Sequence, residues 1–244
     1  MGVASKSILA MLIACMPFAA TCLLTVGFCV HIAGIPIADI GLNTRAPALS
    51  QAGGGLAIGL LFGSSIFLAG RACGWFYIAP SQLSSNPSKG LPVFCGALAY
   101  TVTASALEEI AYRGCLFALL LNTAGVPTAV VGSTAVFALS HFHLQTRCPA
   151  LYVINACLFG LLITYCRLAT GALWLPIGVH IGANLTSVSV FGMPIAGQPN
   201  NRGLITCVVK GPELITGGNY SYAAGFLGTV GLLAAGSAAM LLAL

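Results

Sequence analysis

Long apolar runs alternate with short, polar, turn-rich connections along most of this chain. A helix needs about 20 apolar residues to cross the hydrocarbon core of a bilayer. The pattern therefore predicts membrane-spanning helices at residues 8–30, 52–70, 92–121, 126–142, 149–166, 170–190 and 222–244. The third run is too long for one straight span and too short for two. It either begins as an interfacial helix or is broken, so the predicted count is seven to eight spans.

The composition supports a membrane domain. Hydrophobic residues make up 58% of the 244 residues and charged residues only 5%, whereas globular domains carry about 25% charged residues. So few charges cannot cover a water-exposed surface, and we predict one all-α, polytopic transmembrane helical bundle covering residues 1–244. Gly55, Gly59 and Gly63 repeat at every fourth position of the second run, a small-xxx-small pattern that suits close helix packing.

The few charges indicate how the bundle is oriented. The nine Lys and Arg residues are scattered singly and give a net charge of +5, so no basic run of the kind that binds nucleic acid is present. Arg113 lies within an apolar run and is left out. If the N-terminus is cytoplasmic, six of the other eight lie on the inner side and two on the outer side: Lys6, Arg71, Lys89, Arg147, Arg202 and Lys210 against Arg45 and Arg167. Cytoplasmic loops carry an excess of Lys and Arg, so we predict a cytoplasmic N-terminus. The low charge and the Gly and Ala content favour a bacterial inner (plasma) membrane.

Two of the four acidic residues, Glu108 and Glu109, are neighbours inside the third apolar run. A charged side chain in a span costs at least about 2.5–3.5 kcal/mol on insertion scales, and such residues usually mark chemistry or transport. Arg113 follows Glu109 by four residues, the favourable order for an ion pair on one helix face. Glu108 then has no partner on its own helix and is the candidate general base. A purely structural role for the three charges is the alternative interpretation.

Two more polar patterns with helical spacing lie in later apolar runs. His141 follows Phe137 by four residues, and Asn184 follows His180 by four. The last two side chains would share one helix face and offer two donors to a developing oxyanion. Each pattern alone is equally compatible with hydrogen bonds that only join helices.

The three patterns occur in a fixed order: EExxxR at 108–113, FxxxH at 137–141 and HxxxN at 180–184. Over about residues 90–190 this trio resembles the CAAX prenyl endopeptidase and bacteriocin-processing (CPBP) family of membrane proteases. Tyr112 stands where that family usually has Phe, which is a conservative difference. The resemblance implies an intramembrane endopeptidase that acts on a membrane-associated substrate: a CAAX-like prenylated tail, a leader peptide or a bacteriocin-related peptide.

The resemblance also implies roles for the motif residues. Glu108 and His141 would activate a water, His180 and Asn184 would stabilise the oxyanion, and Glu109 and Arg113 would orient the site, with no metal or other cofactor. A zinc mechanism is the alternative, with Glu108, His141 and His180 as ligands and an open fourth position. The sequence contains no HExxH helix and identifies no second-shell partners for such ligands, which favours the glutamate mechanism.

Two other functional classes compete with a protease. Intramembrane Glu, His and Arg are typical of ion- or proton-coupled transporters, but paired broken helices of an inverted repeat are not visible in the sequence. A non-catalytic immunity or scaffold protein with the same fold is the other alternative, and the complete motif set argues against it. We expect a membrane-anchored peptide or protein substrate, the bilayer as partner and no nucleic acid. The enzyme hypothesis requires Glu108, His141 and His180 to converge on one water-accessible cavity.

Overall fold

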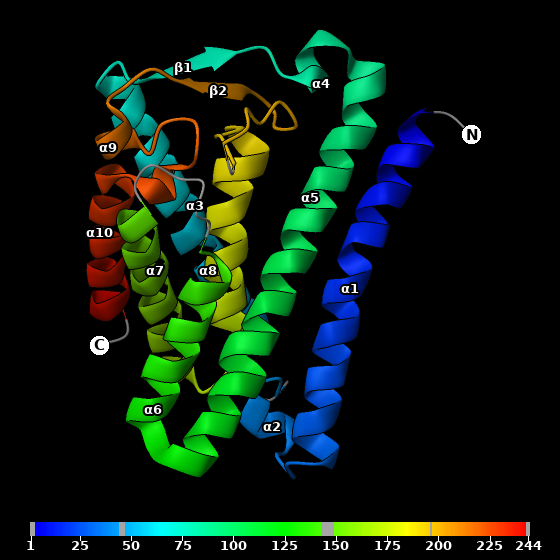
Figure 1. Cartoon of the computed structure of the whole chain (residues 1–244), viewed down its shortest axis with the longest axis vertical. Helices are drawn as coiled ribbons and strands as arrows, with labels where there is room; N and C mark the ends of the chain where they lie inside the picture. Colours follow the sequence, from blue (N-terminus) through cyan, green and yellow to red (C-terminus); the bar gives the residue numbers. More distant parts are fainter. Residues whose placement is uncertain (1–2, 44–46, 143–148, 196, 243–244) are drawn as a thin grey trace.

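The apolar runs fold as long helices that lie side by side, with a small sheet across one end of the bundle (Figure 1). The computed structural model describes residues 3–43, 47–142, 149–195 and 197–242. The α-helices are α1 (Val3–His31), α2 (Ile37–Ile40), α3 (Ala48–Ala72), α4 (Gln82–Ser85), α5 (Pro87–Glu109), α6 (Phe117–Ser140), α7 (Pro149–Thr170), α8 (Trp174–Asn184), α9 (Glu213–Thr216) and α10 (Phe226–Leu242). Two π-helical segments, η1 (Ile110–Leu116) and η2 (Leu185–Val190), continue α5 and α8, and a short 3₁₀ segment, η3 (Tyr222–Ala224), precedes α10.

Each predicted span falls on helix, and the structure is a mostly helical, membrane-type fold. Within the described residues, three helical stretches are long and apolar enough to cross a membrane: Ala48–Ala72, Pro87–Ser140 and Ala150–Thr170. The predicted count of seven to eight spans is therefore not confirmed. Elsewhere in the described part of the chain, α10 provides the shorter apolar stretch Phe226–Met240, and α8 is regular for only 11 residues.

The third run is interrupted directly after the two glutamates. The α-helix ends at Glu109, and the π-helical segment η1 carries the chain into α6. The sharp reversal comes later, at Gly125, which has φ 80° and ψ 177°. A positive φ is readily adopted by glycine, and the chain turns there at the end of the bundle opposite the sheet (Figure 1). The second part of α6 can therefore return alongside α5 and bring its last residue, Ser140, back toward the glutamates.

Helices α3 and α8 pack at the closest distance. Gly55 and Gly59 of α3 face Gly178 and Gly182 of α8, and a Cβ added to Gly59 would lie 2.6 Å from the Ala183 nitrogen and 2.8 Å from the Gly182 Cα. This contact confirms the close packing predicted from the small-xxx-small pattern. It holds α8 between α3, α5 and α7, and so fixes the helix that carries the HxxxN pattern.

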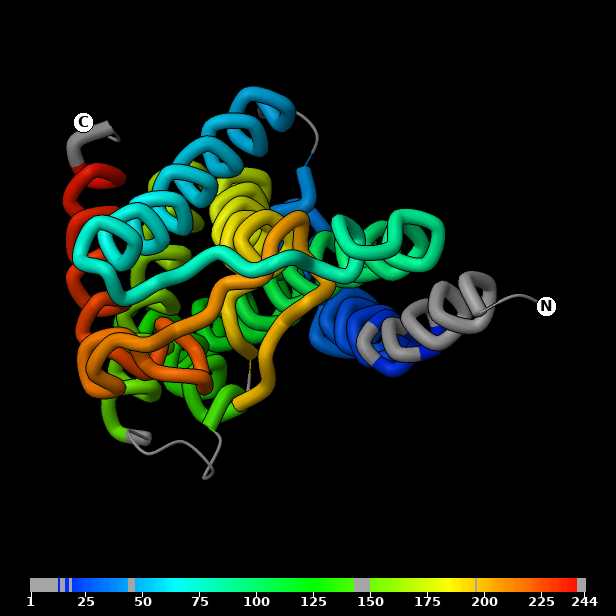
Figure 2. The backbone as a smooth tube through the Cα atoms, turned by 90° about the horizontal axis from the view of Figure 1, so that it is seen from above, coloured from blue at the N-terminus to red at the C-terminus, as the bar shows by residue number. Residues whose placement is uncertain are grey.

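A two-stranded antiparallel sheet closes one end of the bundle. β1 (Phe76–Ala79) pairs with β2 (Thr206–Val209), with Phe76 opposite Val209. Figure 2 looks down on this end, where both strand segments cross over the helix ends. The sheet is a small addition to a fold that is otherwise all-α, as predicted. Each strand has only four residues, too few to give a periodic signal inside connections that otherwise resemble polar loops.

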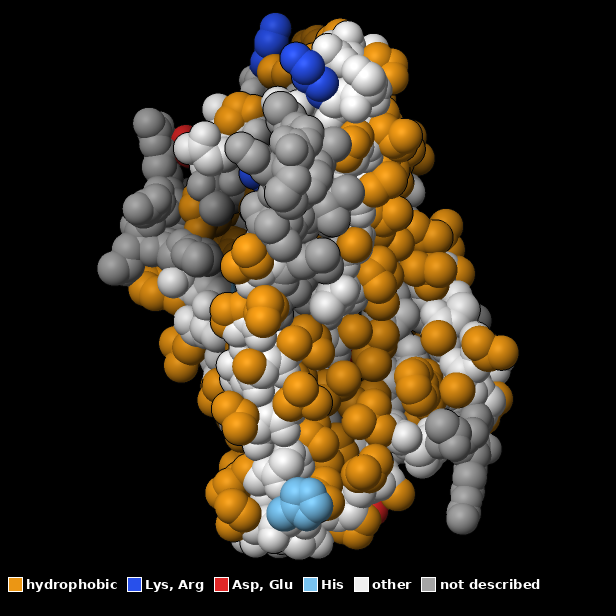
Figure 3. Space-filling view, turned by 90° about the vertical axis from the view of Figure 1, so that its right-hand side faces the viewer, with side chains coloured by type: hydrophobic (Ala, Val, Ile, Leu, Met, Phe, Trp, Pro, Cys, Tyr) orange, Lys and Arg blue, Asp and Glu red, His pale blue; other side chains and the backbone are white. Residues whose placement is uncertain are grey.

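The outer surface is largely apolar. Leu24, Leu61 and Val131 are 75%, 71% and 67% exposed, and Figure 3 shows apolar side chains over most of one face. Exposed apolar area on this scale fits contact with lipid.

The cations are segregated toward the ends of the bundle. Figure 3 shows Lys and Arg side chains gathered at one end. Arg71, Lys89 and Lys210 lie next to the sheet, at the end of α3, the start of α5 and the end of β2. Arg167 lies at the opposite end, where its Nη2 donates to the Asp39 carbonyl of α2. For these four cations the separation agrees with the predicted grouping on two sides of the membrane. Arg45 and Arg147, which also belong to that grouping, fall outside the described residues.

Candidate active site

Three side chains predicted to act together meet between α5, α6 and α8. Glu108 Oε2 lies 3.5 Å from His141 Nε2 and 3.9 Å from His180 Nε2. Asn184 lines the same cavity as these three residues. The convergence that the enzyme hypothesis required is therefore present, although the residues come from three separate stretches of the chain.

Two π-helical segments directly follow the motifs on α5 and α8. The segment η1 begins one residue after Glu109, and η2 begins one residue after Asn184. A π-helical turn changes the direction of the side chains around it, and such turns are frequent at functional sites. The sequence predicted a possible break near the glutamates, but it gave no signal for the second segment.

Glu109 and Arg113 form a fully buried ion pair beneath the cavity. Arg113 Nη1 donates to Glu109 Oε1 at 3.3 Å, and both side chains have 0% exposure. Arg113 Nη2 also donates to the Gly160 carbonyl of α7 at 3.2 Å. The guanidinium carbon lies 4.2 Å from the centre of the Phe137 ring. The pair expected from the four-residue spacing thus also ties the glutamate segment to α6 and α7.

The same carboxylate fixes the protonation pattern of His180. His180 Nδ1 lies 2.6 Å from Glu109 Oε1. Because Arg113 donates to this oxygen as well, we assign the shared proton to Nδ1 of His180. In a neutral imidazole, Nε2 then carries a lone pair on the side of Glu108. His180 can therefore donate to an oxyanion from Nε2 only as an imidazolium, whose charge the Glu109 carboxylate would offset.

His141 is held by its own helix. Its Nδ1 lies 2.8 Å from the Phe137 carbonyl oxygen, which can only accept, so the Nδ1 carries a proton and Nε2 faces Glu108. The Tyr112 hydroxyl donates to Ser140 Oγ at 2.9 Å, next to His141. Tyr112, which departs from the usual Phe, therefore supplies an additional hydrogen bond to the end of α6.

Asn184 is oriented by a residue that the sequence analysis missed. Its Nδ2 donates to Ser105 Oγ at 3.0 Å, and Ser105 is 1% exposed. In this orientation the second N–H of the Asn184 amide can donate to another acceptor. A signal was available, because Ser105 precedes Glu109 by four residues and shares its helix face.

The motif residues lie in the wall of a cavity of about 960 Å³. This volume lies near the upper end of the range for small-ligand sites. The cavity extends from Glu108 along α5 toward the sheet end, where it reaches the loop between η2 and β2. Its lining joins apolar residues of α5 and α7 with polar groups of that loop, including Gln198, Asn200 and Arg202. The cavity therefore offers room for a peptide beside the carboxylate.

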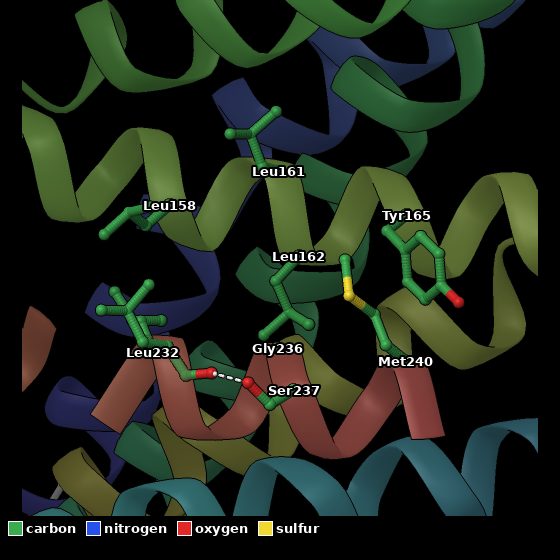
Figure 4. Close-up of a pocket in the computed structure, with 9 residues that line it drawn as sticks. Leu158, Leu161, Leu162, Tyr165, Leu232, Gly236, Ser237 and Met240 are labelled. Carbon is green, nitrogen blue, oxygen red and sulfur yellow. Dashed lines mark hydrogen bonds between the residues drawn. The ribbon is translucent and has the colours of Figure 1, made fainter. Parts of the chain in front are cut away.

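A smaller cavity of about 240 Å³ lies between α7 and α10 (Figure 4). Its lining is dominated by leucines, and the Ser237 hydroxyl there donates to the Leu233 carbonyl at 2.9 Å within α10. It contains none of the side chains that the three motifs supply. We assign this cavity to helix packing.

The structure permits a test of the zinc alternative. The Nδ1 protons on His141 and His180 leave both Nε2 atoms toward Glu108, and Glu109 supplies the second-shell carboxylate that the sequence could not identify. Tetrahedral zinc ligands lie about 3.3 Å apart, whereas the His180 Nε2–Glu108 Oε2 distance is 3.9 Å. In the part of the chain that the structure describes, no group of three His, Cys, Asp or Glu side chains is arranged to hold a metal ion. The donors have suitable chemistry, but this arrangement does not place them as a zinc site.

Comparison with known proteins adds one finding. Residues 90–186 match the family model described as type II CAAX prenyl endopeptidase Rce1-like. The matched segment includes all three motifs and ends two residues after Asn184. No curated protein and no solved structure gave a significant match.

Proposed function

Because residues 90–186 match the model of the Rce1-like type II CAAX prenyl endopeptidases, we propose that the chain is a member of this family and an intramembrane endopeptidase that hydrolyses a peptide bond near the C-terminus of a membrane-anchored substrate. The family is one of hydrolases, and the apolar helices make the chain an integral membrane protein. The observation that carries the proposal is the position of Glu108 Oε2, within 3.5 Å and 3.9 Å of two imidazole nitrogens at the wall of the large cavity.

The proposed mechanism begins with a water held between Glu108 and His141. Both Glu108 Oε2 and His141 Nε2 can accept a hydrogen bond from it, so the water's lone pair is aimed at the substrate carbonyl. Glu108 takes one proton as the water attacks and later returns it to the leaving amine. The oxygen of the tetrahedral intermediate accepts hydrogen bonds from the His180 imidazolium and from the Asn184 amide.

Glu109 and Arg113 position these groups without touching the substrate. The Glu109 carboxylate accepts the Nδ1 proton of His180 at 2.6 Å and so fixes the orientation of the imidazole ring. Arg113 balances the charge of Glu109 and anchors it to α7 through the Gly160 carbonyl. This arrangement supports a metal-free mechanism, with zinc bound by Glu108, His141 and His180 as the alternative.

Replacing Asn184 by Ala should lower kcat by about 10²–10³-fold with little change in KM, because it removes a donor to the oxyanion. Replacing Ser105 by Ala should lower kcat by about tenfold, since one neutral hydrogen bond that orients the amide is lost. Steady-state kinetics in detergent or proteoliposomes would measure both. Ser133→Ala is the matched control, because Ser133 is equally buried but bonds only to its own helix. Asn184→Ala with wild-type kcat would remove Asn184 from the mechanism.

The proposed activity can be tested with purified protein in liposomes that contain lipid-anchored peptides with free C-termini. We expect release of a short C-terminal fragment and no loss of activity after treatment with a strong chelator. Loss of activity that zinc restores would instead establish the zinc mechanism. Proton or ion transport without any peptide hydrolysis would favour a transporter, the alternative from another functional class.

The same assay tests the proposed topology. We propose a bacterial inner-membrane protein of seven to eight spans with a cytoplasmic N-terminus, supported by the cations Arg71, Lys89 and Lys210 at the sheet end. Since the cavity reaches that end, substrate added to inverted membrane vesicles should be cleaved faster than substrate added to right-side-out vesicles. Equal or opposite rates would contradict this orientation.

A further inference from the structure

The large cavity continues well beyond the motif residues. On α5 its lining extends from Glu108 back to Val93, fifteen residues earlier, which is about 22 Å along a helix. Its far wall is the loop that follows η2, and Gln198, Pro199 and Arg202 of this loop are exposed where the cavity opens. A chain segment that enters here would run along α5 to the carboxylate.

The loop is fixed to the helix that carries the HxxxN pattern. Leu204 N donates to the Ser189 carbonyl at 2.8 Å, and Ile205 N donates to the Val190 carbonyl at 3.2 Å. Asn200 lies between the two elements, because its Nδ2 donates to the Val188 carbonyl at 2.8 Å. Its Oδ1 also accepts from the backbone nitrogen of Arg202 at 3.1 Å. These hydrogen bonds therefore fix the position of the Arg202 backbone relative to η2.

Charge distinguishes the two ends of the cavity. Among the described residues that line the cavity, Glu108 is the single acidic residue and Arg202 is the single residue of the Lys or Arg type. The guanidinium is a planar donor suited to two parallel hydrogen bonds with a carboxylate. A free peptide C-terminus carries such a carboxylate, which Glu108 would repel and Arg202 would attract.

We propose that Arg202 binds the α-carboxylate of the substrate's last residue and so determines where the chain is cut. This inference rests on the proposed endopeptidase function and assigns a recognition role to the same cavity. The Arg202 guanidinium forms a carboxylate subsite, whereas Glu108 and the two histidines carry out the chemistry.

The test compares one lipid-anchored peptide with a free C-terminal acid and the same peptide with a C-terminal amide. For the wild type we expect kcat/KM to fall by about 10- to 100-fold for the amide, the effect of losing a charge-assisted bond. Arg202→Gln should lower cleavage of the acid by a similar factor and remove the preference. Arg202→Lys should retain part of it. Lys210→Gln is the matched control, since Lys210 lies at the same end over the Tyr77 ring and outside the cavity lining.

Three outcomes would overturn the inference. The wild type could cleave acid and amide equally, or Arg202→Gln could retain the full preference. The third is that Arg202→Gln lowers cleavage of both peptides equally, and only in vesicles with anionic lipid, which would assign Arg202 to a lipid headgroup. Glu108→Gln separates this inference from the proposed function. Cleavage that survives Glu108→Gln removes the proposed active site, whereas Glu108-dependent cleavage without acid preference removes only the carboxylate subsite.

Discussion

Replacing Glu108 by Gln should lower the rate of peptide cleavage by about 10²–10⁴-fold, the contribution of a positioned general base. Glutamine has nearly the same shape and keeps one carbonyl oxygen, but it cannot take a proton from water. KM should change little, because Glu108 lies at one end of a cavity whose other walls bind the substrate. The rate is measured with the lipid-anchored peptide in liposomes under single-turnover conditions.

The effect should be specific to chemistry and not to folding. Glutamine fills the same space and keeps one oxygen beside the two histidines, so the free energy of unfolding should change by no more than about 1 kcal/mol. Glu213→Gln makes the same chemical change outside the cavity lining and should leave the rate within twofold of wild type. A Glu108→Gln protein that folds and retains more than a tenth of wild-type activity would rule out Glu108 as the base.

Replacing Arg113 by Gln should lower the free energy of unfolding by about 3–5 kcal/mol, the typical result of removing one partner from a buried ion pair. The change leaves the fully buried Glu109 carboxylate with His180 as its remaining hydrogen-bond partner, and the Gly160 carbonyl loses its charged donor. The contact of the guanidinium with the Phe137 ring is lost as well. Unfolding in mixed micelles with increasing SDS, followed by tryptophan fluorescence, would measure the change.

The double variant Glu109→Gln/Arg113→Gln distinguishes charge from packing. If an uncompensated buried carboxylate causes most of the loss, neutralising both partners should recover part of the stability. Arg71→Gln is the matched control, because Arg71 is exposed at the end of α3 and should change stability by at most about 0.5 kcal/mol. An Arg113→Gln protein as stable as this control would show that the ion pair does not support the fold.

Local spacing explains what the sequence predicted well. The four-residue separations of Glu109–Arg113, Phe137–His141 and His180–Asn184 each place two side chains on one helix face. The structure has these residues on helical segments, except for His141, which directly follows the last residue of α6. The glycine repeat of α3 likewise indicated a close contact before its partner helix was known. These features depend only on the helix period and on residue size, so they are visible in the chain itself.

The number of spans and the sheet were harder to predict from the sequence. Hydropathy alone does not give helix length, and the regular part of α8 ends at Asn184, where η2 begins. β1 and β2 form through pairing between residues 76–79 and 206–209, which are far apart in the sequence. Four-residue strands gain their stability from such long-range pairing, so neither strand carries a strong signal of its own.

The sequence by itself determined the environment and the chemical groups: apolar helices that need lipid, and an ordered set of acid, imidazole and amide side chains that few structural roles explain. Only the tertiary structure decided how these groups act on one another. Glu109 holds the Nδ1 proton of His180, Ser105 orients Asn184, and Arg202 lines the same cavity as Glu108. Each of these contacts joins different elements of the fold, and the helix period relates only residues on the same helix, so packing alone could establish them.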